Sequence, residues 1–186
     1  MGLFALQPPE NVTVADIAAA ADMTAAAVYY HFPSKEYVLL EGLQAFTDRY
    51  LAKIRELCRR SGDEDFVRQF VADFLDWSEE LRLPAIVYFT HSAGVDAAIE
   101  ALRRQTRIEQ VVILARAIRL YYQGARSDVR FEVAAIGLVS LIENASSSWL
   151  TQDAVFVGLG RRRFVAETVA LAERIIGAAG SPRASN

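Results

Sequence analysis

The sequence predicts an all-α protein, with an N-terminal helix-turn-helix domain followed by a larger helical bundle. Apolar residues recur at helical spacing from about residue 34 to residue 178, and residues 13–32 carry the start signals of two short helices separated by a tight turn. No strand-like alternation, internal repeat or low-complexity segment interrupts this pattern. We expect the two domains to span residues 1–45 and 46–180, with a frayed tail at residues 181–186.

The segment 13–32 is typical of a helix-turn-helix. Thr13 and Asp16 have the spacing of a capping box, and Thr24 is placed to cap the second helix. Asp22 lies between the two helices, where its side chain tolerates the left-handed backbone of a sharp turn. Because such a motif places its second helix in the DNA major groove, the sequence predicts a DNA-binding domain.

The run from Val28 to Glu36, VYYHFPSKE, together with the pattern from Thr13 to Ala18, resembles the DNA-binding domain of TetR/AcrR-type transcriptional regulators. The resemblance is dense over residues 3–43 and implies a homodimeric repressor that a small-molecule effector releases from DNA. It also implies that Tyr29 and Lys35 lie on phosphates and that His31 lies beside the groove. The alternatives are that the tyrosines pack the small domain, that His31 bonds to local backbone and that Lys35 is solvated. The expected DNA-binding residues are Thr13, Thr24, Ala25, Ala26, Tyr29, Tyr30, His31 and Lys35.

Three features weaken the prediction of DNA binding. The net charge is −3, and acids slightly outnumber bases over residues 1–60, whereas phosphate contacts normally dominate affinity for DNA. Ala25, Ala26 and Ala27 offer methyl groups but no hydrogen bonds to base edges. Residues 3–5 resemble only the end of the family's first helix before Pro8-Pro9, so we expect the true N-terminus to lie upstream. The alternative function is a ligand-binding helical dimer that has lost DNA binding.

The last two predicted helices, at about residues 127–150 and 161–178, indicate a partner subunit. Residues 133–142 carry no charge and are apolar on nearly every face, and such a helix is buried all round. We expect both helices to pair with their two-fold mates, so that the homodimer reads a palindromic operator. A monomer with a central helix is the alternative. The expected interface residues are Ile136, Leu138, Val139, Ile142, Val165, Val169, Ala172 and Ile176.

The middle of the larger domain offers aromatic and polar side chains for a largely apolar effector. The expected ligand-binding residues are Trp77, Tyr88, Phe89, His91, Arg116, Tyr121 and Asn144. The alternative is that these aromatic residues are plain core. The run Arg161-Arg162-Arg163 is either a solvated cluster, a cluster that pairs with acids across the dimer, or a site for an anionic ligand such as an acyl-CoA.

Catalysis, metal binding and membrane insertion find no support in the sequence. Two histidines sixty residues apart and the single Cys58 give no metal-ligand spacing and no nucleophile-base pair, and the glycines form no phosphate loop. No apolar run approaches the roughly 18 residues of a membrane helix, and the start lacks the charged region of a signal peptide. We therefore expect a soluble cytoplasmic protein that is not an enzyme and takes no cofactor or metal.

Overall fold

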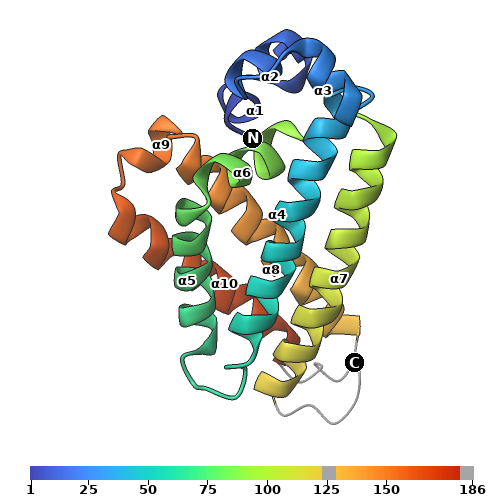
Figure 1. Cartoon of the computed structure of the whole chain (residues 1–186). Helices are drawn as coiled ribbons and strands as arrows, with labels where there is room; N and C mark the ends of the chain where they lie inside the picture. The colour runs from blue at the N-terminus through green and yellow to red at the C-terminus, as the bar shows by residue number, and fades with distance from the viewer. Residues whose placement is uncertain (123–128, 181–186) are drawn as a thin grey trace.

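A computed structural model describes residues 1–122 and 129–180, and these residues form helices and no strand (Figure 1). Three short helices cap one end of a bundle of longer helices, as the sequence predicts. The short helices at this end are α1 (Gly2–Leu6), α2 (Val14–Ala20) and α3 (Ala25–His31), with the 3-10 turn η1 (Pro9–Asn11) between the first two. The bundle contains α4 (Lys35–Cys58), α5 (Phe66–Glu80), α6 (Arg82–Ile86), the π-helical turn η2 (Val87–His91), α7 (Ala97–Tyr121), α8 (Val129–Leu150), α9 (Ala154–Val157) and α10 (Arg161–Gly180).

The helix α4 belongs both to the small end and to the bundle. One face of α4 is buried along its whole length, from Leu39 near its start to Leu57 near its end. Phe4 of α1 is 2% exposed and joins the same continuous apolar core as the bundle helices. Because burying one large apolar side chain stabilises a fold by about 1.5–3 kcal/mol, this shared core holds the small domain firmly on the bundle.

The helical pattern predicted from about residue 34 to residue 178 is confirmed in the described residues, and the helix predicted at residues 161–178 is confirmed to within about two residues. The short elements η1 and α9 escaped prediction because a single turn has no periodicity to detect. The expected start of α8 at Ser127-Asp128 and the expected tail at residues 181–186 lie outside the described residues. The boundary at residue 45 falls inside α4 and stays a prediction.

The helix α8 is the apolar helix of the bundle. Among the helices of residues 1–122 and 129–180 it is the one that is long and apolar enough to cross a membrane, although the sequence contains no unbroken apolar run of that length. Half of its most apolar 18-residue window is buried inside the bundle. Core helices of soluble proteins can be equally long and apolar, so this length and composition are weak support for a membrane span.

Lys35, the first residue of α4, ties the N-terminal segment to the bundle. Its ammonium group donates hydrogen bonds to the backbone carbonyls of Pro9, Glu10 and Val12 at 2.8, 3.2 and 2.8 Å. These three acceptors match the three donors of an ammonium group. Lys35 therefore holds the η1 segment against the start of α4, and with it the approach to α2.

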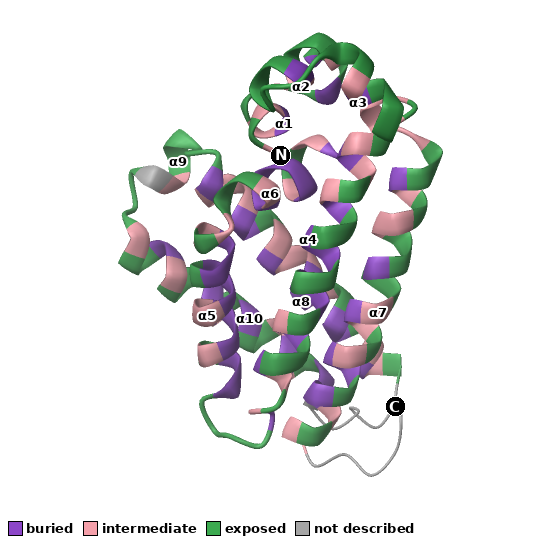
Figure 2. Ribbon diagram, in the orientation of Figure 1, coloured by how far each residue is buried: buried purple, intermediate pink, exposed green. Residues whose placement is uncertain are grey.

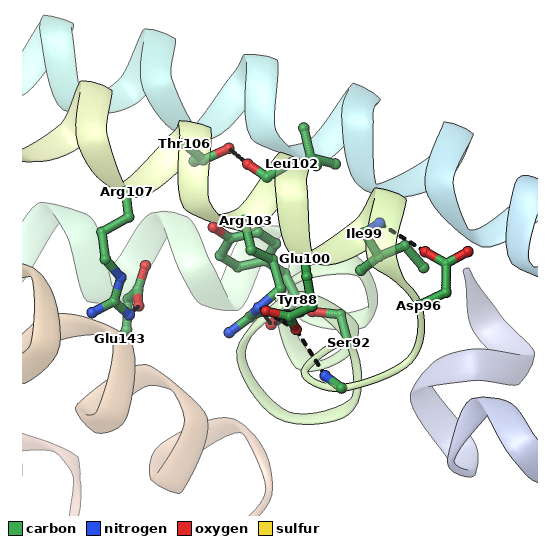
Figure 3. Close-up of polar contacts among 11 residues, drawn as sticks. Tyr88, Ser92, Asp96, Ile99, Glu100, Leu102, Arg103, Thr106, Arg107 and Glu143 are labelled. Atoms are coloured by element: carbon green, nitrogen blue, oxygen red, sulfur yellow. Dashed lines mark hydrogen bonds and ion pairs between the residues drawn. The ribbon is translucent and has the colours of Figure 1, made fainter.

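One carboxyl group lies between three long helices. Glu143 of α8 accepts a hydrogen bond from the hydroxyl of Tyr50 on α4 at 3.1 Å and one from Arg107 on α7 at 3.4 Å. Figure 3 shows Arg107 reaching from α7 to this carboxyl. Burial raises the pKa of Glu143, and the guanidinium of Arg107 and the hydroxyl of Tyr50 oppose that rise.

We expect Lys35→Met to lower the free energy of unfolding by about 1–3 kcal/mol, because three carbonyls lose a charged donor. Urea denaturation followed by circular dichroism measures the effect. The control is Lys53→Met, which breaks a pair with Glu56 on the surface of α4 and should change the free energy of unfolding by less than about 0.5 kcal/mol. Equal effects of the two substitutions would contradict the role given to Lys35.

We expect Glu143→Gln to change how stability depends on pH. The folded chain binds the Glu143 proton more tightly than the unfolded chain, so this group stabilises the fold below an unfolded pKa of about 4.3. That contribution is lost as the pH rises through the raised folded pKa. The melting temperature of the variant minus that of the wild type should therefore rise from about pH 4 to about pH 7. Parallel pH profiles would show that Glu143 is not shielded from water.

Candidate nucleic-acid interface and effector core

The two short helices α2 and α3 begin at the predicted caps. The hydroxyl of Thr13 accepts the N–H of Asp16 at 3.1 Å, and the carboxylate of Asp16 accepts the N–H of Thr13 at 2.9 Å. The Thr13 hydroxyl also donates to this carboxylate at 2.6 Å, and the bonds from the hydroxyl and the N–H of Thr13 lower the pKa of Asp16. Thr24 caps α3 by accepting the N–H of Ala27 at 3.1 Å, and Asp22 has a positive φ of 53°. The predicted helix-turn-helix geometry is thus confirmed, and it fixes which face of α3 points outward.

The outward face of α3 carries two tyrosines beside two alanines. Tyr29 is 57% exposed and Tyr30 is 86% exposed, while Ala25 and Ala26 are exposed beside them. Val28, on the opposite side, is buried against the rest of the small domain. Figure 2 shows that α2 and α3 leave most of their outer surface exposed. The alternative in which Tyr29 and Tyr30 pack inside the small domain is therefore wrong. Their exposed rings leave a surface on α3 that a DNA groove could accept.

Positive charge is scarce on this surface. Lys35 is the only lysine or arginine in residues 1–48. The structure corrects its expected place on a phosphate, because all three of its donors bind carbonyls inside the domain. Thr13, Thr24 and His31 are exposed, and the ring of His31 lies edge-on to Tyr30 at 5.1 Å. Neutral donors therefore make up most of the expected DNA contacts.

The small domain and the bundle meet at η2. The ring nitrogen Nδ1 of His91 donates a hydrogen bond to the backbone carbonyl of Phe4 at 2.7 Å. Beside this contact lies a cavity of about 680 Å³ between residues 8–10 and 35–36 of the small domain and residues 90–95 of the bundle. His91, which the sequence placed among the ligand-binding residues, thus contacts the small N-terminal domain.

Three of the predicted ligand-binding residues come together in the core. Trp77, Tyr88 and Phe89 surround Phe46 of α4 at ring-centroid distances of 5.6, 5.3 and 5.9 Å. The ring of Tyr50 lies 5.7 Å from that of Trp77. Such spacings are those of packed aromatic cores. We call these five residues the aromatic cluster.

The other predicted ligand-binding residues lie elsewhere. Tyr121 packs against Phe66 at the far end of α7, with ring centroids 5.8 Å apart, and Arg116 is exposed on the outer side of that helix. Asn144 lines a groove of about 290 Å³ between α8 and α10. The seven residues therefore do not line one cavity, because helical spacing shows that aromatic side chains share a face without showing which faces meet.

Sequence reasoning missed the polar residues that cross the core, namely Gln110 and Glu143. A signal was present for Glu143, which is the first charged residue after the ten uncharged residues 133–142. For Gln110 the sequence offers no comparable signal, because charged residues lie on both sides of it along α7.

Most of the expected dimer residues point into the bundle of their own chain. The buried members, all at most 5% exposed, are Leu138, Val139, Ile142, Val169, Ala172 and Ile176. Ile136 is 47% exposed, and Val165 is half-buried. The exposed large apolar residues of α8 and α10 are Val129, Val133, Ile136 and Leu171, with Leu141 and Ile175 half-buried. The six buried residues are thus not available to a partner, whereas Ile136 and Val165 remain candidates for the interface. The sequence could not separate the two groups because a helix that is apolar all round gives no periodicity that distinguishes inside from outside.

The helices α8 and α10 approach closely where Gly137 faces Ile175. A Cβ atom at Gly137 would lie 3.0 Å from the Cγ2 atom of Ile175. The lack of a side chain at residue 137 therefore sets the distance between the two helices. We call the five outward residues Val133, Ile136, Leu141, Leu171 and Ile175 the α8–α10 stripe.

The first of the three arginines at the start of α10 forms ion pairs within its own chain. Arg161 pairs with Asp76 at 2.6 Å and with Glu79 at 3.3 Å, both on α5, and lies 5.3 Å from the ring centre of Trp149. Arg162 and Arg163 are exposed. The acids that pair with Arg161 thus belong to its own chain, which weakens the hypothesis of an anionic ligand at this run.

Comparison with known proteins gives a family for residues 1–41 and a fold for the whole chain. Residues 1–41 match the profile of the bacterial regulatory proteins of the tetR family, and a search of curated proteins gives no match. Among solved structures, the fatty acid degradation regulator FadR from Bacillus halodurans is similar, with a TM-score of 0.69 and 17% identity over 94% of this chain and 92% of that chain. A tetR-family transcriptional regulator from Streptomyces coelicolor gives a TM-score of 0.65 and 20% identity over 96% and 77%. The Thermus thermophilus repressor FadR, in complex with lauroyl-CoA, gives 0.61 and 20% over 98% and 92%.

At these identities the solved structures show the fold, and the N-terminal match shows the type of DNA-binding domain. Residues 1–41 therefore form a helix-turn-helix domain of the tetR-family type, and the whole chain has the fold of those regulators.

Proposed function

We propose that the chain is a cytoplasmic transcriptional repressor that binds a palindromic operator as a homodimer and leaves it when a small molecule binds. The observation that carries this proposal is the outward face of α3, with Tyr30 86% exposed, in a segment that matches the tetR family. A capped helix with an exposed aromatic and small-residue face suits insertion into the major groove.

Shape contributes more to this recognition than charge. Ala25 and Ala26 allow close approach and contact thymine methyl groups, and the hydroxyls of Tyr29 and Tyr30 supply neutral donors and acceptors. With Lys35 bound to carbonyls, the small domain offers few charged phosphate contacts. The repressor should therefore depend on DNA whose groove width already fits α3, and its affinity should vary weakly with salt.

The dimer forms through the α8–α10 stripe. Val133 is 61% exposed and Leu171 44% exposed, and a two-fold axis would bury both against a second copy. A two-fold dimer separates its two recognition helices by about 34–36 Å when it reads successive major grooves, which makes the operator a palindrome.

The effector acts through α4 and η2, which connect the small domain to the bundle. Phe46 of α4 lies in the aromatic cluster, and α4 continues into the small domain. His91 follows Phe89 within η2 and bonds to Phe4. A compound that moves the aromatic cluster therefore moves α4 and η2, and it shifts the separation of the two reading helices. Since one similar structure holds lauroyl-CoA, acyl-CoA thioesters are the first compounds to test as effectors.

A second candidate function is a ligand-binding dimer that does not read DNA. The observation that favours it is the absence of any lysine or arginine other than Lys35 from residues 1–48. The two functions differ in one measurable property, which is specific affinity for DNA.

We expect the chain to bind DNA that flanks its own gene more tightly than an unrelated fragment, in fluorescence anisotropy at low and at physiological salt. Tyr30→Ala should weaken specific binding by about fivefold or more, a loss of about 1 kcal/mol. The control is Val155→Ala, which alters an exposed side chain on α9 and should leave the affinity unchanged. A folded dimer that binds both fragments equally, or neither, would favour the second function.

We expect Leu171→Arg to convert the dimer into a monomer and to reduce operator affinity more than tenfold, because the charge would be buried between the two copies. Sedimentation velocity at micromolar concentration measures the assembly. The matched control is Val112→Arg on α7, where the side chain is 65% exposed outside the α8–α10 stripe. If Leu171→Arg still sediments as a dimer, the subunits meet through another face.

A further inference from the structure

A groove of about 460 Å³ lies between α4 and α7, at the ends of these helices that point away from the small domain. The two helices run side by side, and the start of α4 adjoins the small domain (Figure 1). No residue of the aromatic cluster lines the groove, so the two are separate. Basic and apolar side chains make up most of the lining, chiefly Arg55, Arg59, Arg116, Val112, Ile113 and Leu120.

The charge that faces the groove is positive and largely unpaired. Arg55 on α4 pairs with Glu109 at 3.1 Å, so its charge is offset. Arg59, the C-cap of α4, and Arg116 on α7 are exposed, and neither guanidinium has an ion pair or hydrogen bond within the described residues. The lining includes no acidic residue. Two free guanidinium groups on one concave surface therefore favour an anion that binds both of them.

The small polar residues of the lining add donors without negative charge. Burial raises the pKa of the Cys58 thiol to about 12, so it stays protonated at neutral pH. Ser61, in the turn after α4, carries a hydroxyl that can donate to a ligand oxygen. Neither residue opposes the binding of an anion.

The rest of the groove is apolar. Val112 and Leu120 lie one helical turn before and after Arg116, so these three side chains share one face of α7. Val112 is 65% exposed and Leu120 is 54% exposed, which leaves apolar surface next to the free arginines. A simple inorganic anion would leave this surface in water. A ligand with an anionic head and an apolar body would cover it.

We propose that this groove binds an alkyl phosphate monoester. The phosphate lies between Arg59 and Arg116, and the alkyl chain lies along the apolar face of α7. A phosphate monoester carries a charge of about −1.5 to −2 at neutral pH, which matches the two unpaired guanidinium groups. Its three terminal oxygens accept hydrogen bonds from two arginine forks at once, whereas a carboxylate has two oxygens and one charge. The site goes beyond the proposed function, because binding here does not require that the chain read DNA.

Four probes separate the contributions of the head and the body. They are octyl phosphate, octanoate, inorganic phosphate and octyltrimethylammonium, each used below the concentration at which it forms micelles. Isothermal titration calorimetry on the full chain should show octyl phosphate binding at about millimolar Kd, which is typical of a ligand of this size. Octanoate and inorganic phosphate should bind at least fivefold more weakly, and octyltrimethylammonium should not bind. If octyl phosphate does not bind, or if any other probe binds as tightly, the assigned chemistry is wrong.

Variants of the arginines test the location. Arg59→Gln and Arg116→Gln should each weaken octyl phosphate binding about fivefold or more, because one of two charged donors is lost. The matched control is Arg104→Gln, which removes the same charge from an exposed position of α7 outside the groove and should leave binding unchanged. Equal losses in Arg104→Gln and Arg116→Gln would show that the anion follows the overall charge of α7 and does not occupy the groove.

A variant of the apolar face tests where the chain of the ligand lies. Leu120→Ser should weaken octyl phosphate binding about threefold and leave inorganic phosphate binding unchanged, because it removes apolar contact and no charge. All of these side chains are exposed, so the variants should fold as the wild type does, and circular dichroism checks this. Unchanged binding of octyl phosphate to Leu120→Ser would contradict the placement of the alkyl chain.

A soluble alkyl phosphate and a phospholipid share this chemistry. Vesicles that contain phosphatidic acid, whose head is also a phosphate monoester, distinguish the two sources when they are sedimented with the chain. Octyl phosphate binding without vesicle binding assigns the groove to a soluble compound. Binding to both, with both weakened by Arg116→Gln, extends the site to a lipid head. Vesicle binding without octyl phosphate binding would mean that the arginines meet a charged membrane surface, and it would overturn the proposal.

Discussion

Burial of one face of α4 is the constraint on which the other features of the molecule depend. Leu39 and Leu43 pack under the small domain, while Phe46 and Tyr50 stand among the rings of the bundle. A helix whose two ends are buried in different surroundings cannot tilt without disturbing both. Phe4 and Val12 of the small domain belong to the same core as α4, so the position of the small domain follows that of α4.

The interior of the bundle contains an aromatic part and a polar part, and these two parts differ in how much their side chains can shift. The aromatic cluster is held by area and contact, and rings of this kind can shift past one another at modest cost. The contacts of Glu143 are directional, because the hydroxyl of Tyr50 and the guanidinium of Arg107 must both point at its carboxyl group. The core thus combines an aromatic part that tolerates small shifts with a polar part that fixes the direction of its hydrogen bonds.

The sequence was most informative where local chemistry decides structure. The caps at Thr13 and Thr24 and the turn at Asp22 follow from side chains acting on their own backbone, and all three lie where the residues predict. The sequence was least informative about residues whose contacts lie far away along the chain. Nothing local distinguishes Leu138, which is buried, from Val133, which is exposed, on a helix that is apolar all round. Likewise the acceptors of Lys35 lie more than twenty residues away, so its role became visible only in three dimensions.

The hydrogen bond between His91 and Phe4 uses the main-chain oxygen of Phe4 and not its side chain, so the two positions differ in how freely their residues can be substituted. Any residue at position 4 presents the same carbonyl, so a substitution there leaves the acceptor of this hydrogen bond in place. The donor is a specific side chain and has no such freedom. This hydrogen bond therefore restricts substitution at His91, whereas position 4 is restricted only by the burial of its side chain.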